Sequence, residues 1–198
     1  MAANSAIATR PIEFKAPVQK SSRELVLLAK DGDPEAFGLL YDNYLERIYR
    51  YIYFRVTDEQ TAEDLASQVF CKAWENLDRY KPSGAPFEAW LYTIARNAVI
   101  DHYRTRKETV SLDEITTLAG NGPAPDEEAE LQFETESLRD ALQVLTDEQQ
   151  QVLTLKFISG MSTDEIANML GKRPGAVRAL QMRGLQALSK ILGEDLFA

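Results

Sequence analysis

Apolar side chains recur at three- and four-residue spacing through most of this chain, which is the pattern of amphipathic helices. The first half is predicted to hold three such helices, at about 34–56, 57–77 and 87–106. The first of them opens at Asp33-Pro34, a capping residue followed by a proline suited to the first helical turn. These three helices are expected to form one small bundle.

The second half shows the same periodicity from about Phe133 onward. Gly171 ends a short helix where a left-handed residue is needed, and a last helix starts near Pro174. A short helix, a tight turn and a second helix predict a helix-turn-helix, with Phe157 turned inward on the helix before it. Three helix starts have the spacing of a capping box: Thr57 with Gln60, Thr146 with Gln149, and Ser162 with Glu165.

No segment alternates with period two for long enough to be a strand, so the predicted fold class is all-α. Two small helical domains, 23–107 and 133–198, are expected to be joined by a flexible acidic linker at 108–132. This linker contains TTLAGNGPAPDEEAE, which lacks periodicity and is rich in small and acidic residues. Residues 1–22 are expected to form a flexible N-terminal arm.

The net charge of −9 is distributed unevenly along the 198 residues. Residues 108–151 hold one basic and 12 acidic residues, whereas 1–107 hold 15 of each and 152–198 hold six basic and four acidic. Phosphate binding needs local positive charge, and the flanking segments 1–107 and 152–198 are free of the excess acid. The charge therefore permits nucleic-acid binding by either domain.

Enzymatic and metal chemistry find little support in the sequence. Cys71 has no histidine placed to activate it, His102 has no partner ligands, and no glycine-rich phosphate loop occurs. No catalytic residue, cofactor or metal site is therefore predicted. A single cysteine, and the lack of a signal peptide or long apolar segment, indicate a cytoplasmic protein without direct membrane contact.

The last predicted helix carries side chains suited to reading duplex DNA. Arginine and glutamine can pair with base edges, while cations in the turn before the helix suit phosphates. The predicted contacts are Lys172, Arg173, Arg178, Gln181 and Arg183. A plain helical hairpin with solvated charges is the alternative interpretation.

The helix at 87–106 and the loop before it mix aromatic and basic residues, as in platforms that stack unpaired bases. Phe87 and Trp90 lie on the apolar face and are expected to be core residues. Tyr92 is expected on the opposite, polar face together with Asn97, Asp101 and Arg104. The full candidate set for unpaired bases is Tyr80, Lys81, Tyr92, Arg96, Asn97, Asp101, Arg104 and Arg106.

Together these segments resemble the extracytoplasmic-function group of the bacterial sigma-70 family, which keeps only regions 2 and 4. Region 2 is matched by AEDLASQVFCKAWENLDRY and FEAWLYTIARNAVIDHYR, and region 4 by LTDEQQQVLTLKFISGMSTDEIANMLGKRPGAVRALQMRGLQAL. The match covers roughly residues 25–107 and 138–192. The two regions in this order, at this separation, make the resemblance specific.

The resemblance implies a sigma factor that binds core RNA polymerase through its beta-prime and beta subunits, directs it to promoters and helps to melt the minus-ten element. The helix at 57–77 would dock on the polymerase, with Asp64, Leu65, Gln68 and Phe70 at the matching positions. The loop 78–86 and the polar face after it would hold unpaired bases of the minus-ten element. The last helix would read the duplex minus-thirty-five element, although Ala179 and Leu180 replace polar residues common in the family.

An anti-sigma factor is a further partner that the resemblance implies. The concentrated acidic charge suggests that the linker threads the positively charged channels of the polymerase, with a solvating spacer as the alternative interpretation. Two other functions stay open at this point. A stand-alone helix-turn-helix regulator would use only the C-terminal domain and bind operators without polymerase. An adaptor that binds only proteins would have no use for the aromatic-basic face, and an enzyme is the least supported alternative.

Overall fold

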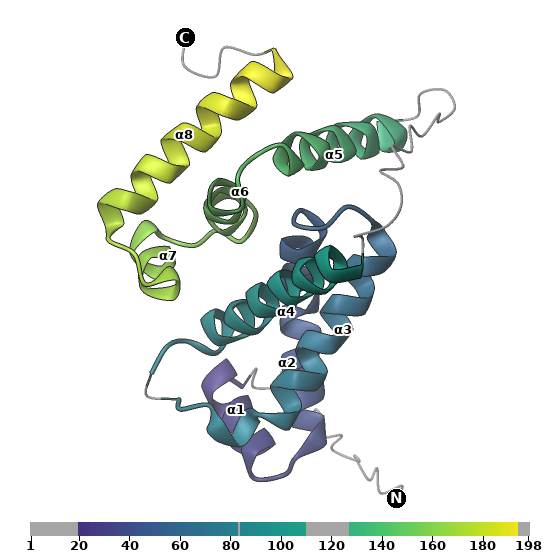
Figure 1. The fold of residues 1–198 in the computed structure, drawn as a ribbon. Helices are drawn as coiled ribbons and strands as arrows, with labels where there is room; N and C mark the ends of the chain where they lie inside the picture. Colours follow the sequence, from purple (N-terminus) through teal and green to yellow (C-terminus); the bar gives the residue numbers. More distant parts are fainter. Residues whose placement is uncertain (1–19, 83, 110–126, 194–198) are drawn as a thin grey trace, which may run out of the picture.

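The computed structural model describes residues 20–82, 84–109 and 127–193. It divides into an N-terminal module, residues 20–109, and a C-terminal module, residues 127–193, drawn in the lower and upper halves of Figure 1. Within these ranges all regular structure is helical, which agrees with the predicted fold class. The expected N-terminal arm, apart from its last residues, and positions 110–126 of the expected linker lie outside the described residues.

The N-terminal module is a bundle of four α-helices with one short 3₁₀ turn. Its elements are α1 (Ser22–Lys30), α2 (Pro34–Tyr53), α3 (Glu59–Glu75), η1 (Leu77–Arg79) and α4 (Phe87–Thr109). The sequence pattern did not predict α1, which begins at the last residue assigned to the arm. Ser21 and Glu24 form a full capping box at its start, and Leu25 and Val26 are buried against the bundle.

The helix starts follow from local capping chemistry. The Asp33 side chain accepts hydrogen bonds from the amides of Glu35 and Ala36, as the Asp33-Pro34 signal predicts. The predicted Thr57 cap is wrong, because Asp58 caps α3 by accepting a hydrogen bond from the Thr61 amide at 2.7 Å. Both residues can cap a helix, and the aspartate one position later does so here.

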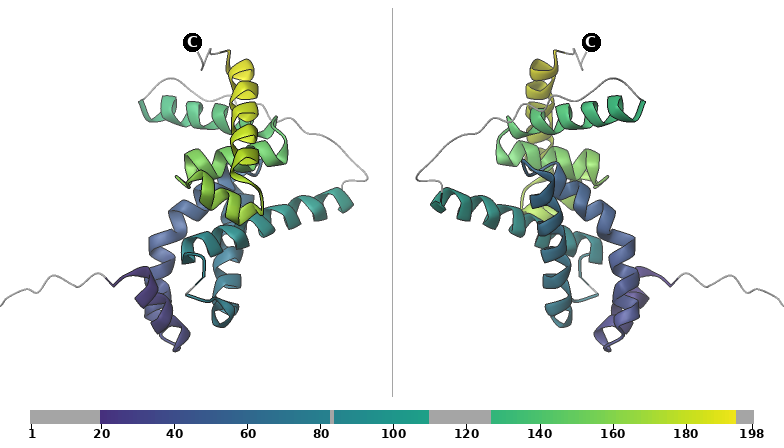
Figure 2. Two further views of the ribbon diagram at one scale, coloured as in Figure 1. Left: turned by 90° about the vertical axis from the view of Figure 1, so that its left-hand side faces the viewer. Right: turned by 90° about the vertical axis from the view of Figure 1, so that its right-hand side faces the viewer.

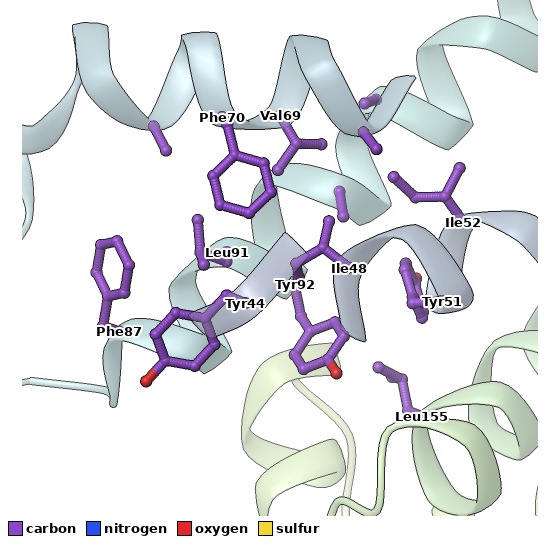
Figure 3. Close-up of a cluster of buried hydrophobic side chains, with 14 of the residues drawn as sticks. Tyr44, Ile48, Tyr51, Ile52, Val69, Phe70, Phe87, Leu91, Tyr92 and Leu155 are labelled. Carbon is purple, nitrogen blue, oxygen red and sulfur yellow. The ribbon is translucent and has the colours of Figure 1, made fainter. Parts of the chain in front are cut away.

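The core of the N-terminal module lies where α2, α3 and α4 meet (Figure 3). Ile48, Ile52, Val69 and Leu91 are fully buried there, each from the apolar stripe of its helix. Phe87 is buried as well, which confirms its expected core position, whereas Trp90 is only partly buried at the edge of the same cluster.

The C-terminal module contains α5 (Glu127–Gln143), α6 (Asp147–Leu153), the π-helical turn η2 (Thr154–Ile158), α7 (Thr163–Leu170) and α8 (Pro174–Leu192). The backbone of α5 begins at Glu127, so 127–132 are helical and do not belong to a flexible linker as expected. The capping boxes of Thr146 with Gln149 and of Ser162 with Glu165 are both confirmed.

The helix-turn-helix consists of α7, a turn at Gly171 and α8. Gly171 has a φ of 63°, the left-handed conformation that its predicted role at the helix end requires. Gly184 lets α8 approach α6 closely, since a Cβ atom there would lie 2.9 Å from Leu153 Cδ1. Among the described residues, no helix is both long and apolar enough to cross a bilayer.

The two modules pack directly on one another. Figure 2 shows the C-terminal helices seated over α2 and α4 from two further sides. Phe54, at the end of α2, is buried among residues of the C-terminal module, and Leu155 of η2 is buried among residues of the N-terminal module. The molecule therefore has an apolar interface between its modules.

Candidate nucleic-acid and polymerase interfaces

The exposed face of α8 carries most of the side chains predicted to read duplex DNA. Val177 and Leu180 are buried and turn this helix so that Arg178 and Arg183 face solvent, with Gln181 half-buried between them. Leu180 is therefore a core residue, whereas Ala179 is exposed. Arg178, Ala179 and Met182 share the exposed surface, and the sequence interpretation overlooked Met182, which is 60% exposed.

The turn before α8 holds one exposed and one paired cation. Arg173 is exposed, whereas Lys172 is half-buried and donates a hydrogen bond to Glu148 Oε1 at 2.6 Å. This hydrogen bond lowers the pKa of Glu148 below its ordinary value. Glu148 therefore competes with a phosphate for the positive charge of Lys172, although two donors of the ammonium group are left by this contact.

The C-terminal half of α4 presents a polar face, as predicted. Asn97 is exposed, and Asp101 forms an ion pair of 3.2 Å with Arg104 three residues later. Arg106 is exposed and donates a hydrogen bond to Thr57 Oγ1 at 3.4 Å. These side chains supply donors and acceptors at helical spacing, which is what hydrogen bonding to the edges of unpaired bases requires.

Tyr92 does not lie on this polar face, so its expected exposure is wrong. Its side chain is fully buried with its ring 5.4 Å from that of Tyr51, and both rings face Leu155 of the C-terminal module (Figure 3). Burial raises the pKa of Tyr92 to about 12. The sequence of one helix does not reveal that a second module covers this side of α4, which is why the expected position differs.

Tyr80 is also buried, although the sequence placed it among the base-binding residues. Its hydroxyl donates a hydrogen bond to the carbonyl of Ala85 at 2.8 Å, and its ring packs against Phe87 and Trp90. Lys81 beside it is exposed. Ten helical residues, about 15 Å, separate Phe87 from the Asn97 face, so the structure does not bring all eight predicted residues into one patch.

Arg96 and Arg104 line a cleft of about 480 Å³ between the modules. Arg55 of α2's end and Lys172 of the helix-turn-helix line the same cleft. Lys172, a predicted phosphate contact, thus lines the same cleft as Arg96 and Arg104, two predicted base contacts.

The outer side of α3 is the candidate polymerase-binding surface. Asp64 and Gln68 are exposed one turn apart, whereas Leu65 and Phe70 are 5% and 3% exposed and belong to the core. Only the first two can contact a partner directly. Trp74, which the sequence interpretation overlooked, is 44% exposed on α3 and packs edge-on against Phe37, so it adds an apolar element.

A second surface suited to protein contact is an apolar groove on the C-terminal module. Its volume is about 250 Å³, and Phe157 at its rim is 56% exposed rather than turned inward as expected. The groove lies between α5, η2 and α8 and is lined by Leu138, Leu142, Leu153, Thr154, Phe157, Ile158, Leu185, Leu188 and Leu192.

The described residues contain no group of three or more side chains able to hold a metal ion. Cys71 is exposed on α3, and His102 lies half-buried beside Tyr103 on α4.

Family models match both modules. The model for sigma-70 region 2 matches residues 40–109, and that for sigma-70 region 4 matches residues 135–188. The region 2 match covers α3 and the polar face of α4, and the region 4 match covers the helix-turn-helix.

Individual relatives agree with the family models. The ECF RNA polymerase sigma factor BldN of Streptomyces coelicolor is 38% identical over 174 residues, which cover 87% of this chain and 66% of BldN. The ECF RNA polymerase sigma factor SigW of Bacillus subtilis is 31% identical over 174 residues, which cover 82% of this chain and 92% of SigW.

Solved structures show the same fold. CnrH, in its complex with the cytosolic domain of CnrY, matches with a TM-score of 0.69 at 27% identity over 88% of this chain and 98% of that one. The sigma factor RpoE of Bartonella quintana, in its complex with the anti-sigma factor NepR, matches with a TM-score of 0.64 at 22% identity, covering 80% and 98%. The chain therefore belongs to the extracytoplasmic-function group of the sigma-70 family, the sigma factors that direct RNA polymerase to promoters, and it carries regions 2 and 4 of that family.

Proposed function

We propose that the protein captures unpaired bases of the minus-ten element on the polar face of α4. The observation that carries this proposal is the row of Asn97, Asp101 and Arg104 at helical spacing on region 2, in which Asn97 and Arg104 are exposed and Asp101 is half-buried. Bound bases offset the few kcal/mol that unstacking costs, so binding energy drives melting without covalent chemistry. Lys81 and Arg106, both exposed, would bind the backbone of the same strand in this proposal.

In this proposal, α8 reads the duplex minus-thirty-five element. Arg178, Gln181 and Arg183 would contact base edges, and Arg173 with Lys172 would contact phosphates. Exposed Ala179 offers an apolar contact to a thymine methyl group, where the family often has a polar residue.

Two surfaces are proposed to hold core polymerase. The exposed Asp64, Gln68 and Trp74 on α3 would bind the beta-prime subunit, with Leu65 and Phe70 shaping α3 from beneath. The apolar groove beside Phe157 would accept an apolar element of the beta subunit. An anti-sigma factor that covered these surfaces would hold the protein inactive, and such a factor is a proposed partner because solved relatives are complexes of this kind.

Two single substitutions on α4 test whether base capture is separate from polymerase binding. Asn97→Ala and Asp101→Ala are expected to reduce discrimination between a correct and a mismatched single-stranded minus-ten oligonucleotide by about tenfold each, the value of one lost specific hydrogen-bonded contact. Binding to core polymerase should stay at the wild-type level, because neither residue lies on the exposed face of α3.

Asn43→Ala provides the matched control, since Asn43 is exposed on α2 and belongs to none of the proposed surfaces. This control variant should keep the wild-type discrimination between oligonucleotides and the wild-type affinity for core polymerase. Loss of core binding in the Asn97 or Asp101 variants, or unchanged discrimination, would contradict the site assignment.

A further inference from the structure

The cleft between the modules has the size and the charge of a site for a small anion. It lies where α4 and the end of α2 face α6 and the turn before α8, and its volume is about 480 Å³. Small-molecule sites usually measure about 300–1,000 Å³. The charged side chains that line the cleft are four basic and two acidic ones, namely Arg55, Arg96, Arg104, Lys172, Asp147 and Glu148.

Two of these cations lack the partners that buried charged groups usually have. Arg55 is 3% exposed, and within the described residues its guanidinium group makes one hydrogen bond, to the Asp147 carbonyl at 3.2 Å. The Nε atoms of Arg55 and Arg96 are both buried without an acceptor in the described part of the chain. Neither guanidinium group forms an ion pair there. A buried N–H without an acceptor is unfavourable, so an anion beside these two arginines would stabilise the protein.

The other two cations are paired but keep donors for an anion. Lys172 contacts Glu148 at 2.6 Å, and Arg104 contacts Asp101 at 3.2 Å. An ammonium group has three N–H donors and a guanidinium group has five, so neither contact uses them all. Lys172 belongs to the C-terminal module and Arg104 to the N-terminal module. An anion in the cleft would therefore meet donors from both modules.

The composition of the lining favours an organic phosphate. Its excess of two positive charges complements a phosphate monoester, which carries a charge of about −1.5 to −2 at pH 7. Guanidinium groups bind phosphate through paired hydrogen bonds, and an ammonium group binds it as a point charge. Val99, Ile100 and Leu170 form an apolar wall in the same cleft, with Tyr103 beside them. This wall suits an organic group attached to the phosphate.

We propose that the cleft is a binding site for a small organic molecule that carries a phosphate monoester group. Arg55 and Arg96 bind the phosphate from the N-terminal module, and Lys172 binds it from the C-terminal module. The apolar wall contacts the organic group. Binding of this molecule does not depend on the proposed sigma-factor function.

One consequence of the site does rest on the proposed function. Arg96 and Arg104 are predicted contacts of the minus-ten element, and Lys172 is a predicted phosphate contact beside the minus-thirty-five element. A phosphate ester in the cleft occupies these same cations. The bound molecule therefore competes with promoter DNA for them.

The test titrates the full, isotope-labelled chain with phenyl phosphate, a phosphate monoester that carries an apolar ring. Nuclear magnetic resonance follows the Nε–H signals of Arg55 and Arg96, and both should shift in a saturable way. Arg96→Gln and Lys172→Met should each weaken binding about tenfold, because each removes a charged donor. Inorganic phosphate should bind more weakly than phenyl phosphate, since it makes no contact with the apolar wall.

The matched controls are Arg50→Gln and Arg173→Met, which remove exposed cations that do not line the cleft. Arg173 is the direct neighbour of Lys172 in the chain, so this pair separates the cleft from the charge around it. Both controls should keep the wild-type affinity, and wild-type helical circular dichroism would show that every variant is folded.

Three results would overturn the site. Phenyl phosphate could leave both arginine signals unshifted, or it could bind no more tightly than inorganic phosphate. The control variants could also weaken binding as much as the cleft variants, which would show diffuse attraction of anions to the surface.

Competition with DNA is measured with the single-stranded minus-ten oligonucleotide. Saturating phenyl phosphate should weaken binding of this oligonucleotide to the wild-type chain, and unchanged binding would contradict the competition. The proposed function fails in a different way. If the protein did not bind the oligonucleotide at all while phenyl phosphate bound as expected, the phosphate site would stand and the assignment of base capture to α4 would be wrong.

Discussion

At the scale of single residues, packing against neighbouring segments explains why two of the predicted base-binding residues are buried. Tyr92 and Tyr80 are polar aromatic residues that a single helix or loop would place at the surface, and both are buried. A second module covers Tyr92, while Phe87 and Trp90 cover Tyr80. By contrast, the exposure of Asn97, Arg178 and Arg183 was predictable, because each lies off the apolar stripe of its own helix.

The buried hydroxyl of Tyr92 leads to a prediction about alkaline pH. Its pKa is raised to about 12, whereas an unfolded tyrosine ionises near 10. A raised pKa in the folded state leaves stability intact below about pH 10 and removes it as the pH rises toward 12. Between pH 8 and pH 11 the wild type should therefore lose about 1 kcal/mol more of its free energy of unfolding than Tyr92→Phe.

Urea unfolding of both proteins at the two pH values measures this difference. Tyr49, whose pKa is also raised to about 12, is present in both proteins and cancels. Equal losses in the wild type and the variant would show that Tyr92 is not buried in the protein in solution.

At the scale of secondary structure, periodicity and capping chemistry predicted most helices well. The starts of α2, α6 and α7 and the end of α7 at Gly171 agree with their sequence signals. The helix α1 was missed, although Ser21 and Glu24 have the spacing of a capping box, because the segment before it shows no periodicity. The π-helical turn η2 was not predicted, because apolar periodicity does not distinguish it from the end of the α-helix that it follows.

Two glycines within helices are expected to respond oppositely to alanine. Gly184→Ala places a methyl group against Leu153 where α8 crosses α6, and such overpacking should cost about 1–2 kcal/mol. Gly38→Ala adds a methyl group in open space on α2, so the gain in helix propensity should stabilise the protein by about 0.5–1 kcal/mol. Urea unfolding of the full chain measures both changes.

Each glycine variant controls for the other, because both add the same methyl group to a helix. A Gly184→Ala protein at least as stable as the Gly38→Ala protein would contradict the close crossing of α8 over α6.

At the scale of the whole molecule, the order of the modules was predictable and their packing was not. Apolar periodicity and capping residues within each module predict its helices. The contacts of Phe54 and Arg139, by contrast, join residues more than 80 positions apart in the chain. The polymerase surface shows the same limit, since Asp64 and Gln68 are exposed as expected while Leu65 and Phe70 are buried. Family resemblance marks matching positions, and only the fold shows which of them face outward.

The whole account depends on the protein directing core polymerase to promoters through both modules. Run-off transcription with purified core RNA polymerase and a promoter library tests this most directly. We expect transcripts only when the protein is present, from promoters that share a minus-ten and a minus-thirty-five motif. Arg178→Ala should weaken selection of the minus-thirty-five motif alone. Transcripts that do not depend on the protein, or promoters that share no motif, would contradict the account.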